Sequence, residues 1–254
     1  MSIQAKNKIN VSIIAPGFAP SVDVQNQIKS FIKNQSIFNF KMPPKLIQKD
    51  PLFSNTEDKR ARFLLDALKD NTTDIIWCLR GGYGSLPLIP YLQTIKKPKK
   101  YKCIVGLSDI TSLHLFVNEF WSWPSVHGSN LDRLALGQVP PLVLAELKGI
   151  LTKEKTETGF KKLKPLNDLA KKTKSIHATL TGGNLVTMCS HLGTSFQPSF
   201  KNQFLFIEDI GERAYRIDRC LTQLQLSGAL KGCRGILVGQ FTSCKEPDGH
   251  SLWP

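Results

Sequence analysis

The sequence predicts an α/β protein in which an N-terminal parallel-sheet layer domain of the flavodoxin or Rossmann type precedes a smaller C-terminal α/β domain. Three observations support this prediction. Short apolar runs alternate with helical patterns from residue 10 to about residue 130. Two of these runs end in glycine or serine turns, as strands of an open parallel sheet do. A lysine-rich stretch then separates this part from a second group of strand and helix patterns.

The N-terminal part repeats an order of apolar strand, loop and helix, which is the order of an α/β layer fold. The pattern predicts a strand in INVSIIAPG, helices near 21–34 and 55–69, a strand in DIIWCLRGGYGS at 74–85, a strand at 101–106, a helix at 109–117 and a strand that ends at His127 and Gly128.

The C-terminal elements begin after the most lysine-rich stretch, residues 131–175, in which one helix is predicted at 141–152. We therefore expect domains at 1–150 and 176–254, joined by a linker at 151–175. The second domain is predicted to contain a turn into a helix in TLTGGNLVTMCSHLG, a strand in FLFIEDIGE, a helix that includes Tyr215 and Leu224, and a strand at 235–241.

Composition indicates a soluble globular chain, since 41% of its 254 residues are hydrophobic. No apolar run is long enough for a signal peptide or a membrane span. The six cysteines occur singly without metal-binding spacing, so we expect a cytoplasmic protein with reduced thiols and no metal site. The net charge of +14 comes largely from lysine runs that lack interleaved aromatic residues, which favours a solvated surface over nucleic-acid binding.

Ser108 directly follows the strand predicted at 101–106 and opens the next helix. A serine at such a turn is held clear of the sheet, where the helix-opening N–H groups can stabilise an oxyanion. The sequence G-x-S-D lacks the second glycine of the usual nucleophile motif, and serine is also a preferred helix N-cap. Local sequence therefore leaves both a nucleophile and a cap open.

Gly81, Gly82 and Gly84 follow the strand predicted in 74–85. Because the carboxyl ends of parallel strands share one edge of the sheet, we expect these glycines beside Ser108. Their N–H groups would then donate to an oxyanion or to a substrate carboxylate. An ordinary tight turn is the alternative.

Glu208 and His127 are two further polar residues next to apolar strands. Glu208 is the first polar residue after FLFI. It would either orient a histidine in a nucleophilic triad, or cap a helix or pair with Arg213 or Arg216. For His127, a structural role is more common than a catalytic one.

Taken together, these segments resemble the LD-carboxypeptidases, the murein tetrapeptide carboxypeptidase family of serine peptidases, which also includes the microcin C immunity hydrolases. The resemblance runs from about residue 10 to residue 244. Its motifs occur in family order as APG at 15–17, RGGYG at 80–84, GLSD at 106–109, HG at 127–128, TGGNL at 181–185, EDIGE at 208–212, YRIDRCLTQL at 215–224 and GILVGQF at 235–241.

The resemblance implies a Ser-His-Glu hydrolase in which Ser108 is the nucleophile and Glu208 orients the catalytic histidine. The amide of Asp109 and a glycine amide, Gly81 or Gly82, would form the oxyanion hole. Family members release the terminal D-alanine of murein tetrapeptide by cleaving an L,D bond in cytoplasmic cell-wall recycling. They use no metal or cofactor and are commonly homodimers. We therefore expect a murein peptide as partner, and neither nucleic acid nor a membrane.

The chain departs from the family pattern near its C-terminal end. In the family, the catalytic histidine follows a glycine several tens of residues beyond the strand matched by 235–241, whereas this chain ends at Pro254. His250 follows Gly249 but lies too close to that strand, and His127 is also a weak substitute. Loss of one triad member lowers the rate by several orders of magnitude and leaves binding in place. The sequence therefore predicts poor turnover, as expected of a truncated or frame-shifted product or of an inactive homologue.

Two other functions remain open. A hydrolase of microcin C-type acylated nucleotides would use the same nucleophile, and Trp121 or Trp123 would stack on the nucleobase, although tryptophan more often packs in a core. A non-catalytic protein would instead bind muropeptide without cutting it. Release of D-alanine separates this binding protein from the carboxypeptidase.

Overall fold

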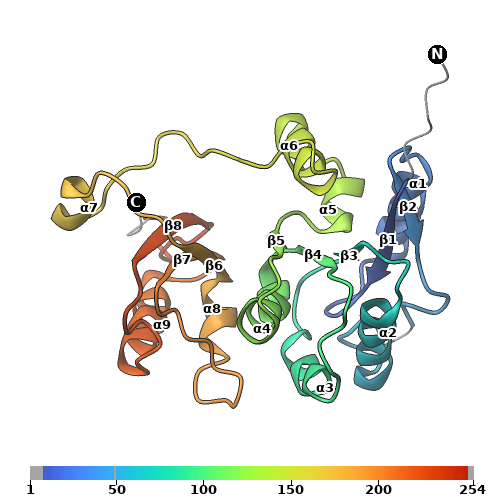
Figure 1. Cartoon of the computed structure of the whole chain (residues 1–254), viewed down its shortest axis with the longest axis horizontal. Coiled ribbons are helices and arrows are strands. Elements are labelled where there is room, and N and C mark those ends of the chain that lie inside the picture. The colour runs from blue at the N-terminus through green and yellow to red at the C-terminus, as the bar shows by residue number, and fades with distance from the viewer. Residues whose placement is uncertain (1–7, 49, 251–254) are drawn as a thin grey trace.

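The computed structural model describes residues 8–48 and 50–250, which form two sheets with helices packed around them (Figure 1). One sheet has five strands and the other has three, and every strand pairing among the described residues is parallel. The predicted α/β class, with a larger parallel sheet followed by a smaller unit, is confirmed.

The larger sheet contains the strands of the N-terminal part. They are β1 (Ile9–Ile14), β2 (Phe38–Lys41), β3 (Ile75–Cys78), β4 (Cys103–Gly106) and β5 (Val126–His127). Their order in the sheet is β2-β1-β3-β4-β5, which is the order of flavodoxin-like sheets. The direction in which successive strands are added to the sheet therefore reverses between β1 and β3. Folds of this type bind ligands at such a point, at the carboxyl ends of the strands.

Helices cover both faces of this sheet. They are α1 (Val22–Lys33), α2 (Glu57–Lys69), α3 (Ile89–Gln93), α4 (Thr111–Trp121), α5 (Leu131–Ala135) and α6 (Pro141–Leu151). Residues of α2, α3 and α4 form one buried apolar cluster, and residues of α1, α5 and α6 form another. Strand side chains alternate between faces. Ile76 and Cys78 of β3 accordingly enter the first cluster, and Ile75 and Trp77 enter the second.

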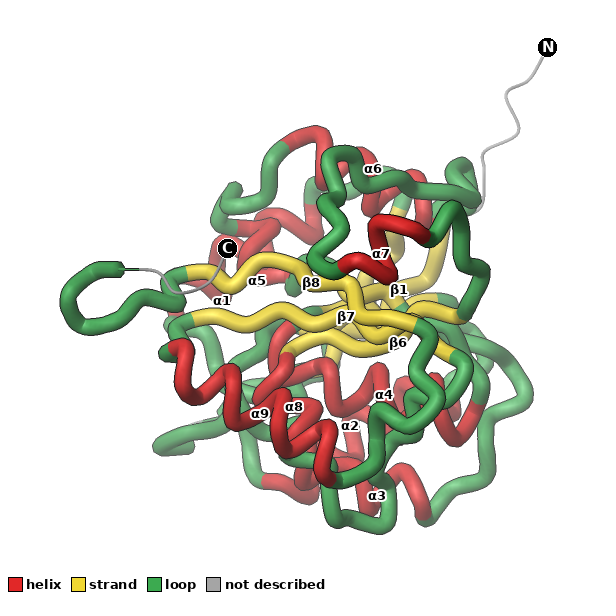
Figure 2. The backbone as a smooth tube through the Cα atoms, turned by 90° about the vertical axis from the view of Figure 1, so that its left-hand side faces the viewer, coloured by secondary structure: helices red, strands yellow, loops and turns green. Residues whose placement is uncertain are grey.

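The smaller sheet contains β6 (Thr179–Asn184), β7 (Gln203–Ile210) and β8 (Gly235–Thr242), in the order β6-β7-β8. The helices of this part are α7 (Asp168–Lys172), α8 (Leu185–Cys189) and α9 (Ala214–Leu226). Figure 2 shows α8 and α9 on the same face of this sheet.

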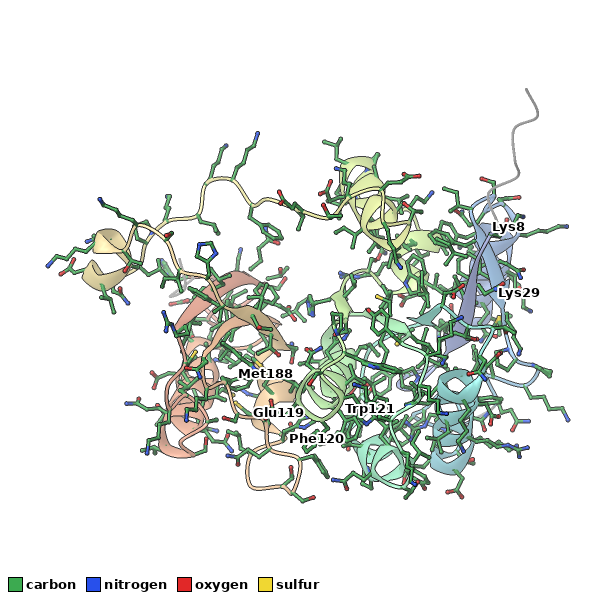
Figure 3. The ribbon with its side chains drawn as sticks, in the orientation of Figure 1. Lys8, Lys29, Glu119, Phe120, Trp121 and Met188 are labelled. Atoms are coloured by element: carbon green, nitrogen blue, oxygen red, sulfur yellow. The ribbon has the colours of Figure 1, made fainter. Side chains whose placement is uncertain are left out.

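Helix α4 packs against both sheets. Its Leu113 belongs to a cluster of the larger sheet, whereas its Leu115 belongs to the cluster that α8, α9 and the smaller sheet form. Figure 3 shows Met188 of α8 near Glu119 and Phe120 at the end of α4. The two sheets therefore meet through the helix that follows β4.

The connection from α6 to β6 has little contact with the rest of the chain, since residues 153–172 are all exposed. Short helix α7 occurs here, inside the stretch predicted as a linker. In the part of the chain that the structure describes, no helix combines the length and apolar character that crossing a bilayer requires.

Two strands differ from the sequence-based expectation. β2 was not predicted, because only Phe38 of its four residues is buried. The prediction of a turn in TLTGGN was wrong, since these residues form β6. Gly182 and Gly183 have φ values of +122° and +144°, and a Cβ on Gly182 would lie 2.0 Å from the carbonyl oxygen of Phe206. The glycines thus allow close approach of β6 to β7 and do not reverse the chain.

Arg60 is a buried cation that joins the loops at the switch point of the larger sheet. Its guanidinium lies 4.4 Å from the centre of the Phe53 ring. Nε donates to the carbonyl of Asn55 at 3.1 Å, and Nη1 donates to the carbonyls of Pro16 and, at 2.6 Å, Gly84. Since Pro16 follows β1 and Gly84 follows β3, Arg60 holds the ends of two neighbouring strands together.

Replacement of Arg60 by methionine is expected to lower the free energy of unfolding by about 2–4 kcal/mol, because buried carbonyls lose a charged donor. Urea unfolding followed by circular dichroism measures this change. Arg62→Met is the matched control, since the Arg62 side chain is 80% exposed and lies 3.9 Å from Asp66 on the same helix. Its expected cost is below about 0.5 kcal/mol, and equal losses in the two variants would contradict the role of Arg60.

Candidate active site

Ser108 lies just beyond the carboxyl end of β4, where the chain turns sharply into a helix. Its φ of +66° is a left-handed conformation that costs a non-glycine residue about 1–2 kcal/mol. A 3₁₀ turn (Ser108–Ile110) begins here and continues directly into α4. The N-cap position belongs to Leu107, and no side chain caps this turn. The cap interpretation of Ser108 is therefore wrong, and backbone strain of this kind is typical of functional sites.

The Asp109 carboxylate ties the serine turn to the glycine-rich turn after β3. It accepts hydrogen bonds from the N–H of Gly84 at 3.2 Å and from the N–H and Oγ of Ser85 at 2.9 and 2.6 Å. Burial raises the pKa of Asp109, although the hydrogen bonds from Ser85 and Gly84 oppose this effect. The two strand-end turns are thus held side by side, as the sequence predicted.

Gly81 and Gly82 bring backbone close to the serine. A Cβ on Gly81 would lie 3.2 Å from the Cβ of Ser108. Gly82 has a φ of +97°, and a Cβ there would lie 2.4 Å from the Phe18 ring. Within residues 8–48 and 50–250, the N–H of Gly82 donates to no acceptor. A side chain is excluded at Gly82, and its N–H remains available to a ligand.

Asn184, which the sequence analysis did not single out, joins α4 to the smaller sheet. Its N–H donates to Thr111 Oγ1 at 2.9 Å, and its Nδ2 donates to Asp209 Oδ1 at 2.8 Å. Its side-chain oxygen caps α8 by accepting from the N–H of Thr187 at 3.0 Å. The TGGN sequence before a helix was the available signal, because asparagine is a preferred N-cap.

Glu208 lies within β7, one strand position before Asp209. The register between β7 and β8 shifts between Ile207 and Asp209, and such a bulge redirects the side chain at that point. Glu208 Oε1 lies 3.7 Å from His127 Nε2 on β5 of the larger sheet. Asp209 instead accepts from Asn184 and from the N–H of Val186. Two adjacent carboxylates therefore face different parts of the molecule.

The Glu208 carboxyl is poorly solvated. Burial raises its pKa to about 7, with a further increase from Asp209 and an opposing effect from Arg133. Its Oε1 accepts no hydrogen bond among the described residues. The predicted alternative, an ion pair with Arg213 or Arg216, is wrong, since these arginines pair with Glu246 and Glu212.

A cavity of about 260 Å³ lies beside Ser108, between the two sheets. Its lining includes the glycine-rich turn, the start of α4, the start of α8 and the end of β7. The lining residues are Gly82, Tyr83, Leu86, Ser108, Asp109, Ser112, Asn184, Val186, Thr187, Ser190, Asp209, Ile210 and Glu212. Gly81 and Glu208 are not part of this lining, and no histidine of the described residues belongs to it.

The other residues considered from sequence lie elsewhere. His250 Nδ1 lies 3.2 Å from Asp248 Oδ2, with its side chain 80% exposed. Trp121 and Trp123 are buried in an apolar cluster of the larger sheet, so the structure offers neither ring to a nucleobase. Among residues 8–48 and 50–250, no group of three or more histidine, cysteine, aspartate or glutamate side chains has a metal-binding arrangement.

Comparison with known proteins agrees with this fold. Residues 11–128 match the LD-carboxypeptidase N-terminal domain, and residues 177–253 match the LD-carboxypeptidase C-terminal domain. A Rickettsia conorii protein provisionally named a carboxypeptidase is 37% identical over 234 residues, which cover 91% of this chain and 74% of that protein. A Bacillus subtilis protein provisionally named a murein peptide carboxypeptidase is 31% identical over 236 residues, 92% of this chain and 72% of that one.

A solved structure gives the same result. The muramoyltetrapeptide carboxypeptidase of Oxalobacter formigenes superposes with a TM-score of 0.77 at 26% identity, covering 93% of this chain and 79% of that chain. The class is thus an α/β protein with a flavodoxin-like sheet, a second parallel sheet and a serine turn at their junction. Within that class, the chain belongs to the LD-carboxypeptidase family, a family of peptidases.

Replacement of Asp109 by asparagine is expected to raise hydrogen-exchange rates of the Gly84 and Ser85 amides by about tenfold or more, because one acceptor for these N–H groups becomes a donor. Exchange followed by NMR measures this effect. Asp168→Asn is the control, since that side chain is 83% exposed on α7. Unchanged exchange in the Asp109 variant would show that the two turns do not depend on this carboxylate.

Replacement of Glu208 by glutamine is expected to stabilise the protein above about pH 7 by about 2–3 kcal/mol. Burial raises the pKa of Glu208 from the ordinary 4.5 to about 7, so the folded state holds this proton more tightly than the unfolded state does. The stability that the protonated form contributes is fully present below pH 4.5 and is lost as the pH rises to about 7.

Urea unfolding at several pH values tests this prediction. The difference between parent and Glu208→Gln should vanish near pH 4.5 and increase up to pH 7. Glu119→Gln, on the exposed end of α4, controls for the change in net charge. A difference that is the same at all pH values would show that Glu208 is not protonated in the folded state.

Proposed function

We propose that this chain is a serine-type LD-carboxypeptidase that cleaves the terminal L,D bond of a murein tetrapeptide and releases D-alanine. The observation that carries this proposal is the left-handed Ser108 at the strand-to-helix turn, beside a cavity that Gly82 also lines. The N–H of Gly82 has no acceptor within the described part of the chain. The names of the Bacillus subtilis and Oxalobacter formigenes relatives support a murein peptide as the substrate.

In the proposed reaction, Ser108 Oγ attacks the carbonyl carbon of the scissile amide. The N–H groups of Gly82 and Asp109 donate to the oxyanion that forms, with Gly81 holding the turn against the serine. Asp109 N–H belongs to the first turn of a helix, where N–H groups lack intrahelical acceptors. The C–N bond then breaks, D-alanine leaves with the proton taken from the serine, and water hydrolyses the acyl-enzyme.

Glu208 has the orienting role in this proposal. A buried carboxylate beside a histidine fixes the ring and stabilises the imidazolium that forms when the histidine takes the serine proton. The pKa of about 7 indicates that Glu208 is poised to ionise when such a partner approaches. No histidine lines the cavity in the described part of the chain, so the residue that acts as general base is not identified. The experiment below tests whether a base acts on Ser108.

The remaining expectations belong to the same proposal. We propose a cytoplasmic enzyme of cell-wall recycling that acts as a homodimer without a metal or cofactor. Its domains correspond to residues 1–150 and 176–254, joined by residues 151–175, of which residues 153–172 are exposed throughout. Hydrolysis of microcin C-type acylated nucleotides would use the same serine, so it is tested with the same variants.

Where a general base acts on Ser108, Ser108→Ala is expected to lower kcat/KM for D-alanine release from murein tetrapeptide by about a thousandfold or more, because it removes the attacking oxygen. Without such a base the parent itself turns over poorly, and the further loss is small because the members of a triad act as a unit. Mass spectrometry of the released D-alanine measures the reaction, and calorimetry with the intact peptide measures binding. Ser30→Ala is the matched control, since Ser30 lies on an exposed position of α1 away from the cavity.

The outcomes separate the candidate functions. Release that depends on Ser108 supports the carboxypeptidase and shows that a base acts on this serine. Binding without release supports a binding protein, and cleavage of an acylated nucleotide with no action on the tetrapeptide supports the microcin-type hydrolase. Release that is equal in the Ser108→Ala and Ser30→Ala variants would overturn the assignment of the nucleophile.

A further inference from the structure

His127 lies at the contact between the two sheets, and the proposed reaction gives it no role. It ends β5, where its Cα pairs with that of Gly106 on β4. Its ring packs edge to face against Phe206 of β7, with ring centres 5.4 Å apart. Its Nε2 lies 3.7 Å from Glu208 Oε1. One imidazole of the larger sheet therefore contacts the smaller sheet and faces the carboxylate with the proposed orienting role.

We propose that His127 is a positioning residue, whose Nε2–H holds one oxygen of the Glu208 carboxylate and leaves the other free for a catalytic partner. This inference rests on the proposed role of Glu208. A separation of 3.7 Å exceeds the limit of about 3.2 Å for an N–H···O hydrogen bond. A small rotation of either side chain would bring the two atoms within this limit.

The partners of the two ring nitrogens determine where the single proton of His127 lies. Nδ1 is buried and has no hydrogen-bond partner in the described part of the chain. A Cβ on Gly183 would lie 3.1 Å from this nitrogen. Nε2 is the nitrogen that faces an acceptor, Glu208. Because a neutral imidazole has one N–H and a buried N–H without an acceptor is costly, the proton belongs on Nε2.

His114 on α4 lies beside His127 and affects its pKa. Its Nε2 lies 2.9 Å from the carbonyl oxygen of Gly106, which can only accept, so His114 carries its proton on Nε2. The His114 and His127 rings lie 6.1 Å apart. Burial, with an added effect from His114, lowers the pKa of His127 to about 3. His127 therefore stays neutral near pH 7 and acts as a hydrogen-bond donor, not as a base.

The groups around Glu208 predict what happens when His127 is removed. Asp209 on β7 raises the pKa of Glu208, and Arg133 near the end of α5 lowers it, while burial is the largest effect. His127 faces the carboxyl from β5, with His114 of α4 behind it. A hydrogen bond donated to the carboxylate stabilises the ionised form. Loss of this donor must therefore raise the pKa of Glu208.

Titration of the Glu208 side-chain carboxyl by 13C NMR tests the proposal on the full chain. His127→Leu is expected to raise the pKa of Glu208 by about one pH unit. His127→Gln, whose amide can donate, is expected to stay closer to the parent. His177→Gln is the matched control, because His177 is exposed in the connection before β6, and it should leave the titration unchanged.

A second measurement uses the unsubstituted chain and so does not depend on the folding of a variant. The 15N shifts of His127 should report a neutral ring protonated at Nε2 between about pH 5 and 8. A proton on Nδ1, or an unchanged Glu208 titration in folded His127→Leu, would overturn the proposal. Neither measurement requires turnover, so failure to release D-alanine would count against the proposed function alone.

Discussion

The buried hydrogen bonds of Asp109 are the interaction on which the candidate site depends. They join the turn after β3 to the turn after β4, and Arg60 holds the first of these turns from its other side through the carbonyl of Gly84. Hydrogen bonds to a charged group contribute about 1.5–3 kcal/mol each. The left-handed backbone of Ser108 costs about 1–2 kcal/mol. The surrounding bonds therefore outweigh the strain, and the serine keeps a conformation that it would not adopt alone.

The sequence predicted those strands whose residues are both apolar in sequence and buried in the structure. β3 and β4 were recognisable because they are apolar runs followed by glycine and serine turns, and the parallel arrangement then placed Gly81 and Gly82 near Ser108. β2 was missed because its alternation of buried and exposed residues is short. β6 was missed because its glycines were interpreted as a turn. Their positive φ values instead accompany the close approach of β7, a segment distant in sequence, which local pattern does not reveal.

The hydrogen-bond network of the site could not be predicted from local sequence patterns either. The bonds of Asn184 to Thr111 and Asp209 join three elements far apart in sequence. Glu208 and Asp209 are neighbours in the chain, and Glu208 was selected from the sequence only by its place after FLFI and by the family resemblance. The structure distinguishes them by their partners. Asp209 is bound by Asn184 and by the N–H of Val186, whereas Oε1 of Glu208 accepts no hydrogen bond among the described residues.

Helix α4 determines how these parts act together. The turn that presents Ser108 is the start of this helix, and Leu115, two turns further along, packs into the cluster of the smaller sheet. Thr111 of the same helix accepts a hydrogen bond from the N–H of Asn184. Asn184 on β6 pairs with Glu208 on β7. A shift between the sheets would therefore move Glu208 relative to Ser108 and would also break buried contacts of α4. Because packing of this kind resists gradual deformation, the distance between the proposed nucleophile and the proposed orienting carboxylate is set by the fold and not by a flexible loop.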